Sequence, residues 1–265
     1  MKAFSINRNW ISVLAILLVL AGWQLAAVRI HLPLLLPTPG QALKQVLELL
    51  LTADFWHHLG ATLGRGLLGF GMALILGLAI GIAAGESKAV YSFFRPLIVV
   101  IRSTPVMSVI ILALIWFRHE RVPVFVAFLM AFPIVVQNII EGFRGIDHQL
   151  IEMVYTYRVG YKDRLLKLYL PSLVPFIAAA ISSGLGITWK VLIAAEVLAY
   201  PPWGIGTQMD TARVYLQTDK VFAWTLVVIG LGLFFDYLLD YLLKRPFRNW
   251  KTATGDSSAP ARGHQ

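Results

Sequence analysis

The residues best suited to chemistry lie in an apolar segment, where Lys190 and Glu196 stand six positions apart. A lysine at the centre of a membrane costs about 2.5–3.5 kcal/mol, so it must face a protein interior or a water-filled route. On a helix, six positions turn the two side chains about 120° away from each other, which argues against a direct pair. Each residue therefore either forms an ion pair with another helix or lines a route for a polar solute.

Three further residues have the same two possible roles. Gln137 and Asn138 interrupt another apolar segment, and Trp189 adjoins Lys190. Amides in an apolar helix form hydrogen bonds to other helices or line a route, and the sequence favours the bonds. The residues that could line a pathway are Gln137, Asn138, Trp189, Lys190 and Glu196.

Enzymatic chemistry is not indicated. All histidines fall in predicted loops, segment ends or the tail, at positions 31, 57, 58, 119, 148 and 264. Ser182 and Ser183 consequently have no base beside them. No HExxH metal motif and no GxxxxGK[ST] phosphate loop occurs. The absence of cysteine removes thiolate ligands and nucleophiles. The chain is predicted to be neither an enzyme nor an ATPase.

The composition places these residues in a membrane. Hydrophobic residues make up 58% of the 265, and charged residues only 14%. A soluble domain has roughly 45–50% and 25%. The net charge of +9 does not indicate nucleic acid, because basic residues in membrane proteins usually mark cytoplasmic loops and no separate basic domain is present.

The apolar segments predict an all-α, polytopic membrane protein with about six spans, because each is long enough to cross as a helix. They lie at about 10–28, 66–85, 96–117, 123–140, 175–198 and 222–243. Fifteen of the 23 Lys and Arg residues fall on the side that holds both termini, which predicts that both termini are cytoplasmic. The first segment could be a signal peptide, but its apolar run exceeds the usual length of about 7–15 residues, which favours a retained span.

Two spans have unusual features. The run 106–117 reaches about 18 Å of the roughly 30 Å required, so the third span must include the stretch from Arg102 to Pro105. This predicts a helix broken near the cytoplasmic face. In the second span, Gly77, Gly81 and Gly85 lie on one helix face, which predicts close contact with another helix.

Residues 1–251 are predicted to form one transmembrane domain, with a disordered cytoplasmic tail over 252–265. An amphipathic outer helix is expected at about 38–52, capped by Thr38 and Pro39. The loop 144–171 is long and basic, and its apolar residues recur at helical spacing from Leu150 to Val159. Its helix could lie on lipid headgroups or insert into a groove of a soluble partner.

Several short motifs occur in a characteristic order. The loop contains Glu152-Met-Val154 and closes on Leu170-Pro171, and Arg158 stands six residues after Glu152, with Gly160 two residues later. Other pieces include Ala61-Thr-Leu-x-Arg65, Arg102-Ser-Thr-Pro105, Ala195-Glu196 and Gly204-Ile-Gly206. In these motifs the chain resembles the permease subunits of bacterial ABC importers, in the branch for nitrate, aliphatic sulfonates, taurine and thiamine precursors. That family has a glycine where this chain has Arg158.

The resemblance implies a type I ABC importer permease fold in the bacterial inner membrane. It implies partners: a second permease copy, an ABC ATPase in two copies that binds ATP and Mg, and an extracytoplasmic solute-binding protein. No cofactor is implied for this chain. The loop helix at 151–159 would couple to the ATPase through Glu152, Met153, Val154, Tyr155, Arg158 and Val159. Lys190 is compatible with a small anionic substrate, and a vitamin precursor is also implied by the branch.

Two other classes remain as alternatives. An ATP-independent channel or secondary carrier would show inverted repeats with interrupted helices in matching halves, and no such repeat is evident. A membrane-embedded enzyme would need a nucleophile and a base within the spans, and these are also missing.

Overall fold

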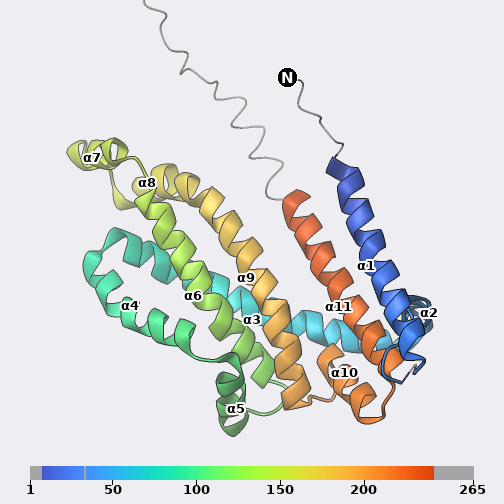
Figure 1. Cartoon of the computed structure of the whole chain (residues 1–265). Helices are drawn as coiled ribbons and strands as arrows, with labels where there is room; N and C mark the ends of the chain where they lie inside the picture. The colour runs from blue at the N-terminus through green and yellow to red at the C-terminus, as the bar shows by residue number, and fades with distance from the viewer. Residues whose placement is uncertain (1–7, 33, 242–265) are drawn as a thin grey trace, which may run out of the picture.

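A computed structural model describes residues 8–32 and 34–241 of the chain, and these ranges contain helices and no strand. Figure 1 shows α7 and α8 at one end of the molecule and α5 and α10 at the opposite end. The predicted tail at 252–265 lies outside the described residues. The helices are α1 Arg8–Ile30, α2 Pro39–Leu50, α3 Ala53–Glu86, α4 Lys88–Ser103, α5 Val106–Trp116, α6 Val122–Arg144, α7 His148–Thr156, α8 Tyr161–Arg164, the π-helix η1 Leu165–Tyr169, α9 Leu170–Ala199, α10 Ile205–Val214 and α11 Thr218–Leu239.

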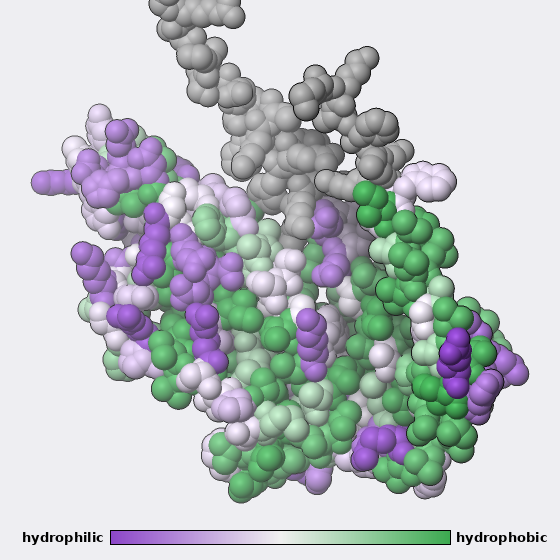
Figure 2. Space-filling view, in the orientation of Figure 1, coloured by the Kyte–Doolittle hydropathy of each residue, from purple (hydrophilic) through white to green (hydrophobic). Residues whose placement is uncertain are grey.

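The all-α polytopic class with about six spans is confirmed. Within the described residues, five helical segments are long and apolar enough to cross a membrane, and α4 and α5 together meet the same criterion for a sixth, with a bend of 101° between them. Figure 2 shows mainly hydrophobic side chains over α1 and α5, while hydrophilic side chains gather over α4, α7 and α8 and over the exposed part of α2. This distribution separates a surface suited to hydrocarbon from a surface suited to water.

The core of the bundle is the contact between α3 and α6, which depends on glycine. A side chain at Gly77 would place its Cβ 2.7 Å from Val135, and one at Gly81 would lie 2.7 Å from Ile139. Gly85 meets Phe143 in the same way. From one contact to the next, the residue numbers rise by four on both helices, so α3 and α6 are parallel. The predicted close packing of the glycine face is confirmed.

The third span is broken within the stretch from Arg102 to Pro105, as predicted, but the break does not lie on the side of the loop 144–171, where the prediction put it. Its helix α4 begins at Lys88, directly after α3, and continues through Pro96. The break falls at Thr104 and Pro105, where the helices turn by 101°. A proline lacks the N–H of a helical bond and disfavours the α conformation in the residue before it. Sixteen helical residues separate the break from the end of α3.

Helix α5 confirms where the break lies. Its Val109 and Ile110 pack against Val126 of α6 and Ala195 of α9, near the ends of those helices that lie away from α7. The break is therefore near the end of the bundle that carries α10 (Figure 1).

The amphipathic helix α2 forms close to its predicted bounds. The Thr38 side chain accepts a hydrogen bond from the Gln41 backbone N–H, and the Gln41 side chain accepts one from the Thr38 N–H. Such a capping box satisfies two donors that the first helical turn leaves free. Helix α1 is attached beside it, since Trp23 stacks on Phe222 at 5.4 Å and donates to the Pro37 carbonyl at 2.9 Å.

Candidate functional site

The loop helix expected to couple to a partner is α7, which starts and ends earlier than predicted. The Asp147 side chain caps it by accepting from the Gln149 N–H at 2.9 Å. At the other end, Arg158 has a φ of 51°, in the left-handed region. The Val159 N–H donates to the Val154 carbonyl and the Arg158 N–H to the Tyr155 carbonyl, which is the hydrogen-bond pattern that ends a helix at a left-handed residue.

Arg158 therefore occupies a position that favours glycine, as its place in the resemblance suggested. A side chain there is strained because its Cβ approaches the following carbonyl oxygen. Arg158 and Val159 follow α7 instead of belonging to it.

The predicted coupling residues point in two directions. Glu152, Met153, Tyr155 and Arg158 are exposed, and Val159 is half-buried. Val154 is only 6% exposed and packs into its own chain. The structure thus brings four of the six side chains to an open surface, with Val154 as the anchor beneath them.

Arg164 fixes α7 against the start of α9, a role that the sequence reasoning missed. Its guanidinium lies 4.7 Å from the centre of the Tyr155 ring and 5.8 Å from that of Tyr161. A cation over an aromatic face at these distances is attracted by the ring. The π-helix η1 follows immediately and leads into α9. The available signal was an arginine that follows two tyrosines within nine residues in a basic loop.

Glu196 lies at the opposite end of the bundle in a buried polar cluster. Its carboxylate accepts from Arg65 Nη1 at 2.8 Å and from the Thr62 hydroxyl at 2.9 and 3.1 Å. The Gly206 N–H donates to it at 3.0 Å. A fully buried carboxylate needs such partners, because an unpaired charge away from water is costly. Glu196 thus forms an ion pair with another helix, one of the two alternatives that the sequence left open.

The loop after α9 closes this cluster through its two glycines. A Cβ at Gly206 would lie 2.5 Å from the Ile193 carbonyl, and one at Gly204 would lie 2.8 Å from the Glu196 carboxylate. The Gly204 N–H donates to His58 Nδ1 at 3.0 Å. Contrary to the prediction, His58 lies inside a helix, since α3 begins at Ala53. The role of Thr62 and Arg65 was missed, although the motif that holds them was noted.

Trp189 and Lys190 are neighbours with opposite surroundings. Trp189 is buried between Gly66 of α3 and Phe235 of α11, whose ring stacks on it at 4.7 Å. Lys190 is exposed, and no carboxylate among the described residues forms an ion pair with it. It lies nine residues before the end of α9, about 14 Å along the helix. Of the pair, Lys190 is the side chain that reaches the surface of the protomer.

The amides of α6 do not bond to another helix. Gln137 donates to Glu141 at 2.9 Å, and Asn138 donates to the Ile134 carbonyl at 2.8 Å. Both partners belong to α6, and both amides are half-buried. The expected bonds between helices are therefore not formed in the described part of the chain.

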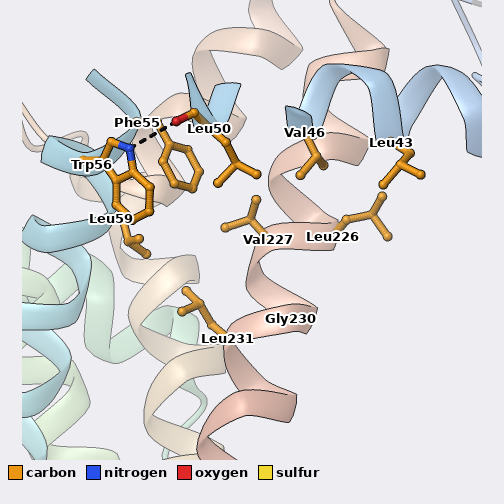
Figure 3. A pocket seen from close by; sticks show the side chains of 10 residues that line it. All are labelled: Leu43, Val46, Leu50, Phe55, Trp56, Leu59, Leu226, Val227, Gly230 and Leu231. Carbon is orange, nitrogen blue, oxygen red and sulfur yellow. Dashed lines mark hydrogen bonds between the residues drawn. The ribbon is translucent and has the colours of Figure 1, made fainter. Parts of the chain in front are cut away.

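Further cavities lie among the described residues. One of about 430 Å³ separates α2, the start of α3 and α11, and Figure 3 shows its aliphatic and aromatic lining. Without a charged lining residue, it does not suit a polar solute. Another, of about 420 Å³, is lined by Lys88, Tyr91 and Arg144 among others. Among the described residues, no group of three acidic or histidine side chains could hold a metal ion.

A bundle of long apolar helices with an amphipathic helix between spans is the architecture of a polytopic membrane protein. The chain belongs to the family of binding-protein-dependent transport system inner membrane components, whose model matches residues 73–248. It is a permease subunit of an ABC importer and not an enzyme.

Several known proteins resemble most of the chain. A putative aliphatic sulfonates transport permease of Bacillus subtilis is 31% identical over 89% of this chain and 85% of its own length. The taurine transport system permease of Escherichia coli is 30% identical over 89% and 87%. A structure of the inward-facing MetNI methionine ABC transporter matches with a TM-score of 0.59 at 17% identity, covering 74% of this chain and 94% of that one. This last likeness supports the fold, and the importer branch predicted from the sequence is confirmed.

Proposed function

We propose that the permease imports a small organic or inorganic anion and couples to its ATPase through the exposed face of α7. Family membership implies an ATPase and a solute-binding protein as partners. Two copies of this chain with two ATPase subunits would form the complex. Both termini and α7 would lie in the cytoplasm, which is supported by the excess of Lys and Arg on that side.

The observation that carries the coupling proposal is the way α7 is presented. Val154 and Arg164 hold the helix against the bundle, and Glu152, Met153 and Tyr155 are left exposed. A short amphipathic helix with an apolar and a charged side chain on its open face suits a groove on a soluble partner. Because α7 leads through α8 and η1 into α9, a movement of the partner would reach a membrane span directly.

The anion proposal is supported by two independent facts. The relatives include permeases named for aliphatic sulfonates, taurine and bicarbonate, which share an anionic group. In this chain, Lys190 is exposed about two-thirds of the way along α9, about 14 Å from the end of the helix, without a carboxylate partner in the described part. A cation at that depth requires water or an anion.

Co-purification tests the coupling surface. The permease would be expressed with the ATPase encoded beside it, carrying Glu152→Arg and Met153→Asp together. We expect at least a tenfold loss of co-purified ATPase with unchanged membrane insertion. Arg118→Glu, a charge reversal in the loop at the opposite end, is the control and should have no effect. Unchanged recovery of the ATPase with the α7 variant would refute the placement.

Uptake measurements test the substrate class. Proteoliposomes with ATPase and binding protein would be offered labelled taurine, methanesulfonate, bicarbonate and thiamine. We expect uptake of at least one of the sulfonates or bicarbonate, lowered several-fold by Lys190→Gln. Uptake of thiamine alone, unaffected by that substitution, would contradict the anion proposal.

A further inference from the structure

Helix α4 has three distinct faces along its length. The face formed by Val90, Phe94 and Ile98 packs against the core of the bundle. A second face is apolar and open, with Phe93 74%, Leu97 48% and Val100 59% exposed. The third face is polar.

The polar face consists of three cations and two serines. Lys88, Arg95 and Arg102 recur every seven residues, and Ser92 and Ser103 lie beside them. At 100° per residue, these five positions fall within an arc of about 100°. Successive cations are about 10 Å apart along the axis. All five residues are exposed, so the face is open over the length of α4.

These cations have no protein partner within the described ranges. No ion pair joins any of them to a carboxylate there. Glu86, two residues before Lys88, accepts a hydrogen bond from the Tyr161 hydroxyl. Glu141 accepts from Gln137. Each cation facing hydrocarbon would cost a few kcal/mol, so the face needs water or anions along it.

The end of this face that lies near α7 opens into the cavity of about 420 Å³. Lys88 and Ser92 line it from α4, and Arg144 lines it from the end of α6. The Arg144 guanidinium lies 5.3 Å above the ring of Tyr91, which holds it next to the polar face. Two cations and a hydroxyl thus converge on a hollow whose lining contains no carboxylate.

We propose that the basic face of α4 lines the aqueous passage of the transported anion, and that the cavity at Lys88 and Arg144 is its exit site on the cytoplasmic side. This inference rests on the proposed function and adds to it the residues that select for negative charge. Cations spaced about 10 Å apart let an anion move between sites without binding one of them too tightly. The open apolar face of Phe93 and Leu97 would then contact lipid or the second permease copy.

The absence of cysteine in the natural chain gives a direct test. Single cysteines would be placed at Ser92 and Ser103 on the polar face, and at Ala89 and Val100 on the open apolar face. The protein would be reconstituted in phosphatidylcholine vesicles and treated with anionic and cationic methanethiosulfonate reagents. Each rate would be divided by the rate of the same reagent with a free thiol.

We expect both reagents to reach the two polar positions at least tenfold faster than the two apolar ones. There the anionic reagent should be favoured about tenfold over the cationic one, and Arg95→Gln in the same chains should lower that preference several-fold. Equal rates on both faces, or no preference for the anionic reagent, would overturn the proposal.

A second arm separates a transported anion from lipid phosphate. If the preference for the anionic reagent persists in vesicles containing phosphatidylglycerol, the result supports a passage for the transported anion. A preference that disappears shows that anionic headgroups occupy the basic face, which would overturn it. Reactivity does not require the ATPase, so unreactive cysteines in a complex that still imports taurine would refute this inference alone. Reactive cysteines in a complex with no anion uptake would refute the proposed function instead.

Discussion

The two ends of the bundle hold their charged residues in opposite ways. At the end near α10, Glu196 is fully buried and meets Arg65, Thr62 and the Gly206 backbone. At the end near α7, Lys88 and Arg144 are exposed around a cavity, and Glu152 makes only an exposed contact with His148. A buried charge whose partners all belong to its own chain has a structural role. An exposed charge without such partners is available to a partner or a solute.

The comparison predicts its largest effect at Glu196. Replacing it with Ala leaves the half-buried Arg65 without its carboxylate, and breaking a buried pair costs up to about 3–5 kcal/mol. We expect a large drop in the midpoint of thermal unfolding in detergent. Lys190→Ala, on the same helix but exposed, should change stability by less than about 0.5 kcal/mol. Similar losses of stability for the two variants would show that buried and exposed charges do not differ in this way.

The second effect concerns the loop that closes the buried cluster. Gly206→Ala would push a methyl group against the Ile193 carbonyl, which lies 2.5 Å from the ideal Cβ position. Overpacking of this kind costs about 1–3 kcal/mol. Gly230→Ala, at a position with open space around it, is the matched control for unfolding measurements. A neutral Gly206→Ala would mean that the loop does not depend on this close approach.

A third effect should appear at the other end, in binding and not in stability. Arg164→Ala removes the cation over Tyr155 and Tyr161, each contact contributing roughly 0.5–1 kcal/mol. We expect the permease to bind its ATPase about fivefold to tenfold more weakly in a fluorescence titration, because α7 loses its fixed position. Lys167→Ala, which breaks an exposed pair with Asp163 at 2.8 Å, is the control. Equal affinities for the two variants would refute the role of Arg164.

The smallest effect is a gain in stability at the end of α7. Arg158→Gly relieves the left-handed backbone at φ 51°, and the expected stabilisation is up to about 1 kcal/mol. Tyr157→Gly, one residue earlier at φ −82°, should destabilise instead. Unfolding midpoints of the two variants measured together would test this opposition. A loss of stability with Arg158→Gly would show that the Arg158 side chain makes a contact stronger than the strain.

Some of these features could be predicted from the sequence because they depend on local patterns. Long apolar runs must be helical in lipid, so the six spans were predicted with the correct class. The start of α2 was predicted from its cap, Thr38 and Pro39. A close helix contact was predicted from the spacing of Gly77, Gly81 and Gly85. The amphipathic spacing from Leu150 to Val159 located α7, within three residues at each end.

Other features could not be read from local patterns. The start of the third span was misplaced because Pro96 resembled a helix start, whereas its helix accommodates that proline and begins at Lys88. The start of α3 was placed at Gly66 because the preceding residues are polar, although His58 and Thr62 are satisfied by a loop 140 residues or more away in the sequence.

The sequence by itself determined that this chain crosses a membrane and to which family it belongs, since hydropathy and short motifs are properties of neighbouring residues. Only the tertiary structure decided which charged side chains, among those described, have a partner of opposite charge within the chain. Lys190 and Glu196 are both charged residues in an apolar run. Glu196 forms an ion pair with Arg65 on another helix, whereas Lys190 forms no ion pair in the described part of the chain. That difference depends on what other helices bring to each side chain.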